Sequence, residues 1–401
     1  MSTAFTQPIV TARRAQNIRY AVRDVVLVAR EAAAAGKDLL YLNIGDPNVF
    51  DFVTPPHIVE AISQALRDNQ TSYTASEGLP AAIEAIRQDA EERCRIRNVR
   101  DVFLGNGASE CIEVALSALV DEGDNVLTPS PGYPFYTAVL GKLGCPEVPY
   151  FLDEARGWLP DVDDIAAKIT PRTRALVLIN PNNPTGSVCD RKTLEAILEL
   201  AARHGIVVFA DEIYDRLLLD DDAKPISIAS LTEDAPILTF NGLSKAYLGP
   251  GLRVGWCTTS GPEAIVRPYI DTMHRFLRAR LCAGHPVQHA VAPALQGDQS
   301  HIVEALGRLR RRRDITVERL NAIEGISCVA PKAAFYAFPR LEENVDDEAW
   351  VKDLIRQTGV VTVHGSGFGQ KPGTSHFRVV FLPPDEILER AFAAIAGFMS
   401  R

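Results

Sequence analysis

Residues 175–186 read ALVLINPNNPTG, and this stretch decides the fold. Its first five residues form an apolar run of the kind found in strands buried on both faces, and a loop rich in Asn and Pro ends the run. Two further apolar runs end in polar loops in the same way, IVVFADEIYD at residues 206–215 and ILTFNGLSK at residues 237–245. Helical patterns lie between them, so the sequence predicts an α/β fold with a mostly parallel sheet flanked by helices on both faces.

The neighbouring segments extend this pattern. Helices are predicted at Ser109–Val120 and Arg191–His204, and Asp190 precedes the second as its N-cap. The predicted strands of this part are Val102–Leu104, Asn125–Thr128, Ala175–Ile179, Ile206–Ala210, Ile237–Phe240 and Val254–Thr258.

The chain changes character after about residue 300. The helical stretch Ile302–Ile323 contains a basic cluster, Arg308–Arg313, which we interpret as a solvated helix face balanced by Asp314 and Glu318. The strands predicted after it are Ser327–Ala330, Ala334–Phe338, Val360–His364 and Phe377–Leu382. We therefore predict a large domain at residues 53–299 and a smaller α+β domain formed by residues 1–52 and 300–401.

Composition and charge exclude several classes of protein. The chain has 401 residues, 46% hydrophobic and 23% charged, which is ordinary globular usage and excludes disordered and disulfide-stapled classes. The net charge of −9 disfavours binding to nucleic acid or anionic lipid, and no apolar run approaches the ~18 residues of a membrane span. Seven scattered cysteines without a C-x-x-C motif suit reduced thiols. We expect a cytoplasmic protein.

The N-terminal 23 residues carry Arg13, Arg14, Arg19 and Arg23 and no acidic residue, a composition shared with mitochondrial presequences. A small-residue cleavage site does not follow them, so we expect this segment to be retained.

Polar residues follow each central strand, at the edge where open α/β sheets bind ligands. Lys245 and Arg253 supply an amine that can form a Schiff base and a cation that grips phosphate. Asp211 suits a protonated ring nitrogen, and Tyr214 and Asn183 suit a phenolic oxygen, which is the set that a pyridoxal ring needs. The turn at residues 105–109 precedes a helix and suits an anion, or is an ordinary turn.

The sequence motifs of other kinds of site fit this chain less well. Glu110 occupies the third glycine position of G-x-G-x-x-G, which argues against a dinucleotide fingerprint. The pair His285 and His289 lacks the glutamate of H-E-x-x-H, so no metal is expected, and Ser244 lacks the closing glycine of a hydrolase elbow. We interpret Gly365–Gly369 as a turn between strands.

The motifs at residues 42–47, 105–110, 180–186, 209–215 and 239–245, with Arg253-x-Gly255, together resemble the class I and II aminotransferases of pyridoxal-phosphate fold type I. Within that family they look most like bacterial glutamate–pyruvate (alanine) aminotransferases. The resemblance covers nearly the whole chain and implies that the large domain binds pyridoxal 5'-phosphate.

The resemblance implies a role for each matching position. Lys245 would hold the cofactor and carry the proton, Asp211 would keep the ring nitrogen protonated, and Tyr214 and Asn183 would bind the ring oxygen. Tyr133 would stack on the ring. The phosphate would be bound by Gly107, Ala108, Ser109, Ser244 and Arg253, while Gly242 replaces a serine that contacts phosphate in many relatives.

The remaining implied positions concern substrate and assembly. Arg378 would bind the substrate α-carboxylate, with Asn183 and Gly45 beside it. Tyr73 would reach the phosphate of a neighbouring subunit, which implies a homodimer with composite sites. Candidates for binding the second carboxylate of glutamate are Tyr20, Arg23, Arg278 and Arg280.

The resemblance implies transamination between L-alanine and 2-oxoglutarate, giving pyruvate and L-glutamate. The alternatives are an aspartate or aromatic aminotransferase, a carbon–sulfur β-lyase on the same fold, and a non-catalytic regulator. A regulator would carry an added DNA-binding domain, for which we see no room.

Overall fold

The computed structural model describes residues 8–18, 21–220, 223 and 226–400, with only the backbone for residues 16–17 and 21–24. Tyr20 and the side chain of Arg23 therefore lie outside the described residues. Within the described ranges, every helix is too short or too polar to cross a lipid bilayer. All seven cysteines are free thiols.

An eight-stranded sheet forms the larger part of the molecule. In spatial order its strands are β2 (Val99–Asn106), β9 (Val254–Ser260), β8 (Ile237–Gly242), β7 (Val207–Asp211), β6 (Thr173–Ile179), β3 (Asn125–Ser130), β4 (Glu147–Asp153) and β5 (Leu159–Pro160). The neighbours β8, β7, β6, β3 and β4 run parallel, whereas β9 and β5 pair antiparallel with their neighbours. All six predicted strands are present, and β4 and β5 are additional.

Helices cover both faces of this sheet, because its strands are apolar on both. Ala175, Val177 and Ile179 of β6 belong to one apolar cluster, and Leu176 and Leu178 belong to another. The first cluster is completed by α4 (Ala108–Ser117), α5 (Pro134–Leu143) and α8 (Glu263–Ala279), the second by α6 (Val162–Lys168) and α7 (Arg191–His204). As predicted, the side chain of Asp190 caps α7, accepting from the backbone N–H of Thr193.

Register aligns the carboxyl ends of the central strands. Ile179 of β6 lies opposite Asp211 of β7, and Asp211 lies opposite Phe240 of β8. The polar loops that follow these strands therefore meet at one edge of the sheet.

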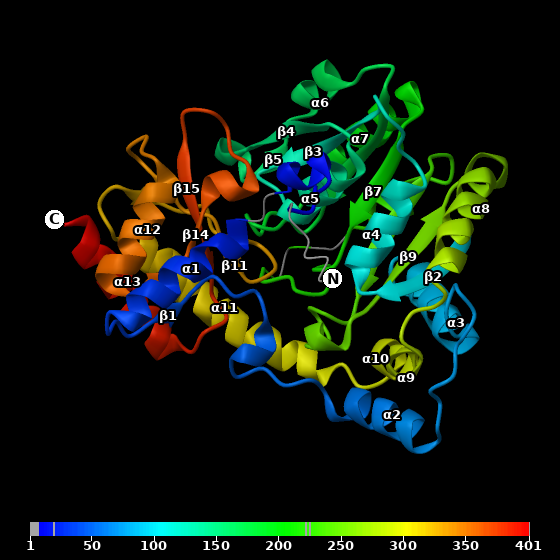
Figure 1. Cartoon of the computed structure of the whole chain (residues 1–401), viewed down its shortest axis with the longest axis horizontal. Coiled ribbons are helices and arrows are strands. Elements are labelled where there is room, and N and C mark those ends of the chain that lie inside the picture. The colour runs from blue at the N-terminus through cyan, green and yellow to red at the C-terminus, as the bar shows by residue number, and fades with distance from the viewer. Residues whose placement is uncertain (1–7, 19–20, 221–222, 224–225, 401) are drawn as a thin grey trace, which may run out of the picture.

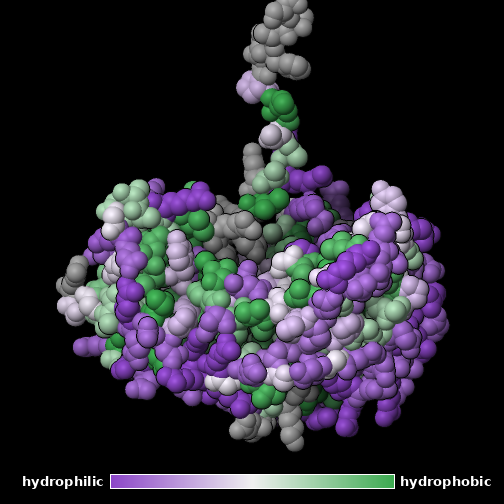
Figure 2. Space-filling model, turned by 90° about the horizontal axis from the view of Figure 1, so that it is seen from below, coloured by the Kyte–Doolittle hydropathy of each residue, from purple (hydrophilic) through white to green (hydrophobic). Residues whose placement is uncertain are grey.

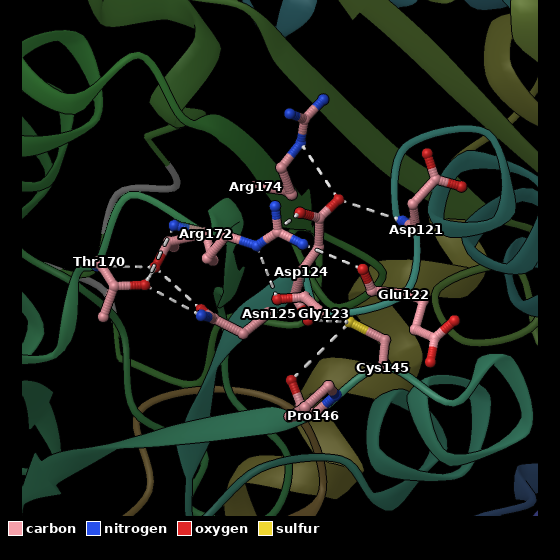
Figure 3. A network of polar contacts seen from close by, with 11 residues as sticks. Asp121, Glu122, Gly123, Asp124, Asn125, Cys145, Pro146, Thr170, Arg172 and Arg174 are labelled. Atoms are coloured by element: carbon pink, nitrogen blue, oxygen red, sulfur yellow. Dashed lines mark hydrogen bonds and ion pairs between the residues drawn. The ribbon is translucent and has the colours of Figure 1, made fainter.

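The opposite edge is fixed by a polar network around Asp124 (Figure 3). Its carboxylate lies 3.7 Å from Arg172 Nε and 3.9 Å from Arg174 Nε, and Arg172 also donates to the backbone oxygens of Glu122 and Gly123. Asn125 Nδ2 donates to Thr170 Oγ1 at 3.1 Å. These bonds join the amino ends of β3 and β6, so they hold the two strands in register.

The second part of the molecule combines both ends of the chain (Figure 1). Its helices are α1 (Ala21–Ala34), α11 (Ser300–Asn321), α12 (Asp347–Thr358) and α13 (Asp385–Met399). A five-stranded sheet contains β10 (Ile326–Ser327), β12 (Arg340–Leu341), β15 (Ser375–Val380), β11 (Tyr336–Ala337) and β14 (Val363–His364). In addition, β1 (Leu40–Tyr41) pairs with β13 (Val360–Val361). The predicted domain boundaries stay a prediction, and this pairing supports joining residues 1–52 to the C-terminal part.

The strand predicted at Ser327–Ala330 is too long. Beyond Ser327 the chain leaves the sheet, because Lys332 and Ala333 donate to Gly186 O, and Ala334 donates to Leu217 O. These bonds tie the C-terminal part to the large sheet's loops.

The remaining helices connect these parts. They are α2 (Pro56–Arg67), α3 (Pro80–Gln88), α9 (His285–Gln288) and α10 (Val291–Gln296), with 3-10 turns at Arg13–Asn17, Pro47–Val49, Glu154–Arg156, Ile228–Leu231, Pro250–Leu252 and Gly365–Phe368, and a π-turn at Asp89–Arg93. Residues 8–12 project from the body (Figure 2), and Ile9 and Val10 among them are 86% and 94% exposed.

The interpretation of Arg308–Arg313 as a solvated face is wrong for Arg312. Only 5% of its side chain is exposed, and its guanidinium donates to both carboxylate oxygens of Asp51, at 2.8 and 2.6 Å. It also donates to Leu382 O and lies over the ring of Phe52. The Nε of Arg312 also lies 3.6 Å from Oδ1 of Asp385, the first residue of α13. One arginine of α11 is therefore buried at the point where Asp51 and the start of α13 both contact this helix.

We expect Arg312→Met to lower the free energy of unfolding by about 2 kcal/mol, because Asp51 and the Leu382 carbonyl lose a charged donor. Chemical denaturation measures the change. Arg311→Met is the matched control: Arg311 pairs with Asp385 but is 74% exposed, so its loss should cost under about 1 kcal/mol. Equal losses in the two variants would contradict the buried role of Arg312.

Candidate active site

A cavity of about 350 Å³ lies at the carboxyl ends of β6, β7 and β8. Most of the residues predicted for the site line it: Gly45, Ala108, Ser109, Tyr133, Asn183, Asp211, Tyr214, Ser244, Lys245, Arg253 and Arg378. Gly107 precedes Ala108 as the N-cap of α4. The structure thus brings together residues that are up to 333 positions apart in the sequence, from Gly45 to Arg378.

One end of the cavity is suited to an anion. Helix α4 begins here without a side-chain cap, so the backbone N–H groups of its first residues are open to a ligand. Gly107 has φ +84°, and a Cβ on it would lie 2.2 Å from Arg253 Nη2. The guanidinium is fixed by donating to Pro250 O at 3.0 Å and Asn106 O at 3.3 Å. With Ser244, these groups form what we call the anion cradle.

Strand β9 closes this cradle from the sheet side. A Cβ on Gly255 would lie 2.0 Å from the backbone N of Ala108, and a Cβ on Gly242 would lie 2.6 Å from Val254 O. A serine at position 242 would therefore require the backbone to move.

Asp211 occupies the deep wall of the cavity and is buried. Burial raises the pKa of its carboxyl from 3.8 to about 6, although the Ile213 N–H, the Tyr136 hydroxyl and the Lys245 charge each lower it. The Tyr136 Oη donates to Asp211 Oδ2 at 3.3 Å, and the Ile213 N–H donates to Oδ1 at 3.4 Å. The wall thus presents a carboxylate whose charge is incompletely compensated, which suits a cationic ligand atom.

Lys245 stands in the middle of the cavity, after the turn that ends β8. Its Nζ donates to the backbone oxygen of Gly45 at 2.9 Å. The ammonium also lies 5.5 Å from the ring centroid of Phe335. A half-buried amine with an apolar wall on one side and a carboxylate behind it is placed to react with a carbonyl compound.

The other end of the cavity contains Arg378. Its Nη2 donates to Asn43 O at 2.9 Å, and its Nη1 donates to Asn183 Oδ1 at 3.3 Å. The guanidinium carbon lies 4.7 Å from the ring centroid of Tyr336 and 4.6 Å from that of Phe368, so the cation packs against two aromatic rings. This end suits a carboxylate.

Tyr336 joins this end to the large sheet. Its hydroxyl lies 2.9 Å from that of Tyr214, and burial raises the pKa of the Tyr214 phenol well above 10. A Cβ on Gly45 would lie 2.5 Å from Tyr336 Oη, so this position leaves room only for glycine unless the tyrosine moves.

Some predicted residues lie elsewhere. Tyr73 is 79% exposed and does not line the cavity. Arg278 is exposed, and Arg280 is bound to Glu110 and to backbone oxygens, so neither lines the cavity in this chain. Their candidate role in binding the second carboxylate of glutamate stays a prediction.

Sequence reasoning missed three aromatic residues. Tyr336 falls inside the predicted strand Ala334–Phe338, where a lone hydroxyl among apolar residues was the available signal. Tyr136 follows the predicted Tyr133 by one helical turn. Phe368 belongs to the loop interpreted as a simple turn, and that loop places a ring over Arg378.

We expect Asp211→Asn to stabilise the ligand-free protein at pH 7 by about 3 kcal/mol, because the pKa differs by about 2.2 units between the unfolded and the folded state. Between the ordinary pKa of 3.8 and about 6, folded Asp211 keeps a proton that the unfolded chain has lost, so the free energy of unfolding falls as pH rises through this window. Denaturation at pH 4 and pH 7 measures the difference. The variant should match the wild type at pH 4, and a variant less stable at pH 7 would contradict the incomplete compensation of Asp211.

Comparisons with known proteins agree with this geometry. The family model described as aminotransferase class I and II matches residues 37–395. The chain is 41% identical over 401 residues to the glutamate-pyruvate aminotransferase AlaA of Escherichia coli, covering 98% of each chain. It is 43% identical over 393 residues to the alanine aminotransferase of Mycobacterium bovis, covering 96% of this chain and 91% of that protein.

Solved structures show the same fold. The alanine aminotransferase from Pyrococcus furiosus superposes with a TM-score of 0.94 at 41% identity, covering 98% of this chain and 100% of the other. Family, fold and geometry lead to the same conclusion: the chain belongs to the class I and II aminotransferases and is an enzyme that depends on pyridoxal phosphate.

Proposed function

We propose that this enzyme transfers the amino group of L-alanine to 2-oxoglutarate, giving pyruvate and L-glutamate in two half-reactions at one site. The names of its relatives support the choice of substrates, because two of them are alanine aminotransferases and one is a glutamate-pyruvate aminotransferase. The observation that carries the proposal is the position of the Lys245 amine, which shares one cavity with Asp211 and Arg378.

The residues of the cavity fit pyridoxal phosphate. The anion cradle offers backbone N–H groups, a hydroxyl and a guanidinium to the phosphate, with Ser109 at the helix start. Asp211 offers a carboxylate to the ring nitrogen, and Tyr214 and Asn183 offer a hydroxyl and an amide to the ring oxygen. Tyr133 supplies an aromatic face. Bound there, the cofactor supplies a sink for the electrons released when a bond at the substrate Cα breaks.

The protein's own groups would do the rest of the chemistry. Lys245 would hold the cofactor through its amine, and the same amine, once free, would move the proton at the substrate Cα. Asp211 would be the carboxylate that pairs with a protonated ring nitrogen. Because its carboxyl has a pKa of about 6 in the ligand-free protein, cofactor binding should lower that value by pairing the charge.

Arg378 would orient the substrate. A planar fork of two N–H donors matches the α-carboxylate and fixes the Cα relative to Lys245. The close approach of Gly45 and the rings around Arg378 keep water away from this contact. Asn183 contacts Arg378 directly, so ring binding and substrate binding share a side chain.

We further propose a homodimer, with large domains at residues 53–299 and composite sites. Ile9 and Val10 are exposed on residues 8–12 (Figure 2), and Leu66 and Tyr73 are 53% and 79% exposed, so a second copy of the chain would cover apolar surface here. Tyr73 would then reach the partner's phosphate. The free thiols and the net charge of −9 support a cytoplasmic location.

The absorption spectrum tests this function. Adding L-alanine to the purified holoenzyme without an oxo acid should convert the aldehyde form of the cofactor to the pyridoxamine form, and 2-oxoglutarate should reverse the change. L-Aspartate and L-phenylalanine serve as comparison donors. A spectrum that responds to these donors but not to alanine would contradict the substrate, and a protein that binds no cofactor would contradict the function.

Substitutions separate the proposed roles of two residues. Lys245→Ala should lower kcat by about 10³-fold or more, because it removes both the covalent link and the proton carrier. Replacing the exposed Lys192 by Ala should have no effect. Near-normal transamination by Lys245→Ala would disprove the mechanism.

Arg378→Lys should raise KM for both substrates at least about tenfold, because the two-bond fork is lost. Arg340→Lys, outside the cavity, is the control.

A further inference from the structure

Arg280 follows the last turn of α8, and its guanidinium lies beside the anion cradle. Its Nη2 donates to Leu104 O at 2.6 Å and to Ser76 O at 3.3 Å, and its Nε lies 3.5 Å from Glu110 Oε2. The side chain is 15% exposed, so its charge is largely withdrawn from water. It does not line the cavity, and its backbone contacts lie near the end of β2 and three residues after Tyr73.

Glu110 explains why a cation is needed there. It is the third residue of α4, and its carboxylate turns back to accept from the Asn106 backbone N–H at 2.7 Å. Gly105 makes room for this contact, because a Cβ on it would lie 3.1 Å from Glu110 Oε2. A negative side chain therefore occupies the first turn of the same helix whose N-terminus faces the anion cradle. Two anions at one helix end compete for the same positive potential.

The Arg280 guanidinium offsets that competition. With Glu110 25% exposed, its charge is only partly screened by water, and Arg280 is the cation that the structure places against it. The neighbouring Arg253 is directed differently, towards Pro250 O and Asn106 O at the cavity wall. The two arginines thus serve different anions on two sides of the cradle.

We propose that Arg280 is a positioning residue for the cofactor phosphate: it neutralises Glu110, so that the first turn of α4 accepts a second anion. This inference rests on the proposed function, because it assigns a phosphate to the cradle.

Titration of the cofactor-free protein tests the proposal. Pyridoxal phosphate, and separately pyridoxal without its phosphate, are added to the wild type, Arg280→Gln, Glu110→Gln and the double variant, and binding is followed by absorbance. Arg280→Gln should weaken binding of pyridoxal phosphate about tenfold, equivalent to ~1.4 kcal/mol, and leave pyridoxal unaffected. The double variant should return to within about threefold of the wild type. Arg278→Gln, exposed on the same helix, should change nothing.

A purely structural role would give a different pattern. If Arg280→Gln binds pyridoxal phosphate as well as the wild type does, if the double variant binds as weakly as the single, or if pyridoxal is weakened equally, the proposal is wrong. Should Arg280→Gln fail to fold, Glu110→Gln alone still decides, since it must tighten binding of pyridoxal phosphate over the wild type. A wild type that binds neither compound would contradict the proposed function instead.

Discussion

The buried carboxylate of Asp211 is the constraint around which this site is built. A charge removed from water at the end of β7 is costly, and the neighbouring donors only partly offset it, since the pKa of the carboxyl rises to about 6. Glu212, next in the chain, is also buried, and its pKa rises to about 8 by burial and by the nearby charge of Asp215. Glu212 does not line the cavity, and among the described lining residues Asp211 is the one that carries a carboxylate. The buried charge of Asp211 lowers the free energy of unfolding, and a cation bound beside it raises that free energy again.

Three contacts assemble the cavity from separate parts of the chain. Lys245 meets Gly45, Tyr214 meets Tyr336, and Asn183 meets Arg378. In each pair, one residue follows a strand of the large sheet, and the other belongs to the N- or C-terminal part. The site therefore exists only when both parts are docked, and the bonds of Gly186 to residues 332–333 help to hold them together.

The sequence predicts a structural feature best where that feature depends on a single segment of the chain. Apolar runs ending in Asn180, Asp211 and Asn241 predict both the strands and their common edge, because a parallel register aligns such ends. Tyr336 and Phe368 were not predicted as site residues because their role arises from packing against Arg378. Arg378 lies 42 and 10 positions further along the chain, respectively. Arg312 was misjudged for a similar reason: charge and helical spacing describe one helix, whereas its burial is caused by Asp51 from the opposite end of the chain.

The two rings packed against Arg378 have a consequence for the strength of binding. The centroids of Tyr336 and Phe368 lie 4.7 and 4.6 Å from the guanidinium carbon, and the residue is only 3% exposed. An arginine withdrawn from water in this way meets its ligand in a medium of low dielectric, where a charged hydrogen bond is stronger than in water. The same rings that support the cation thus strengthen its attraction for an anionic group that reaches its N–H donors.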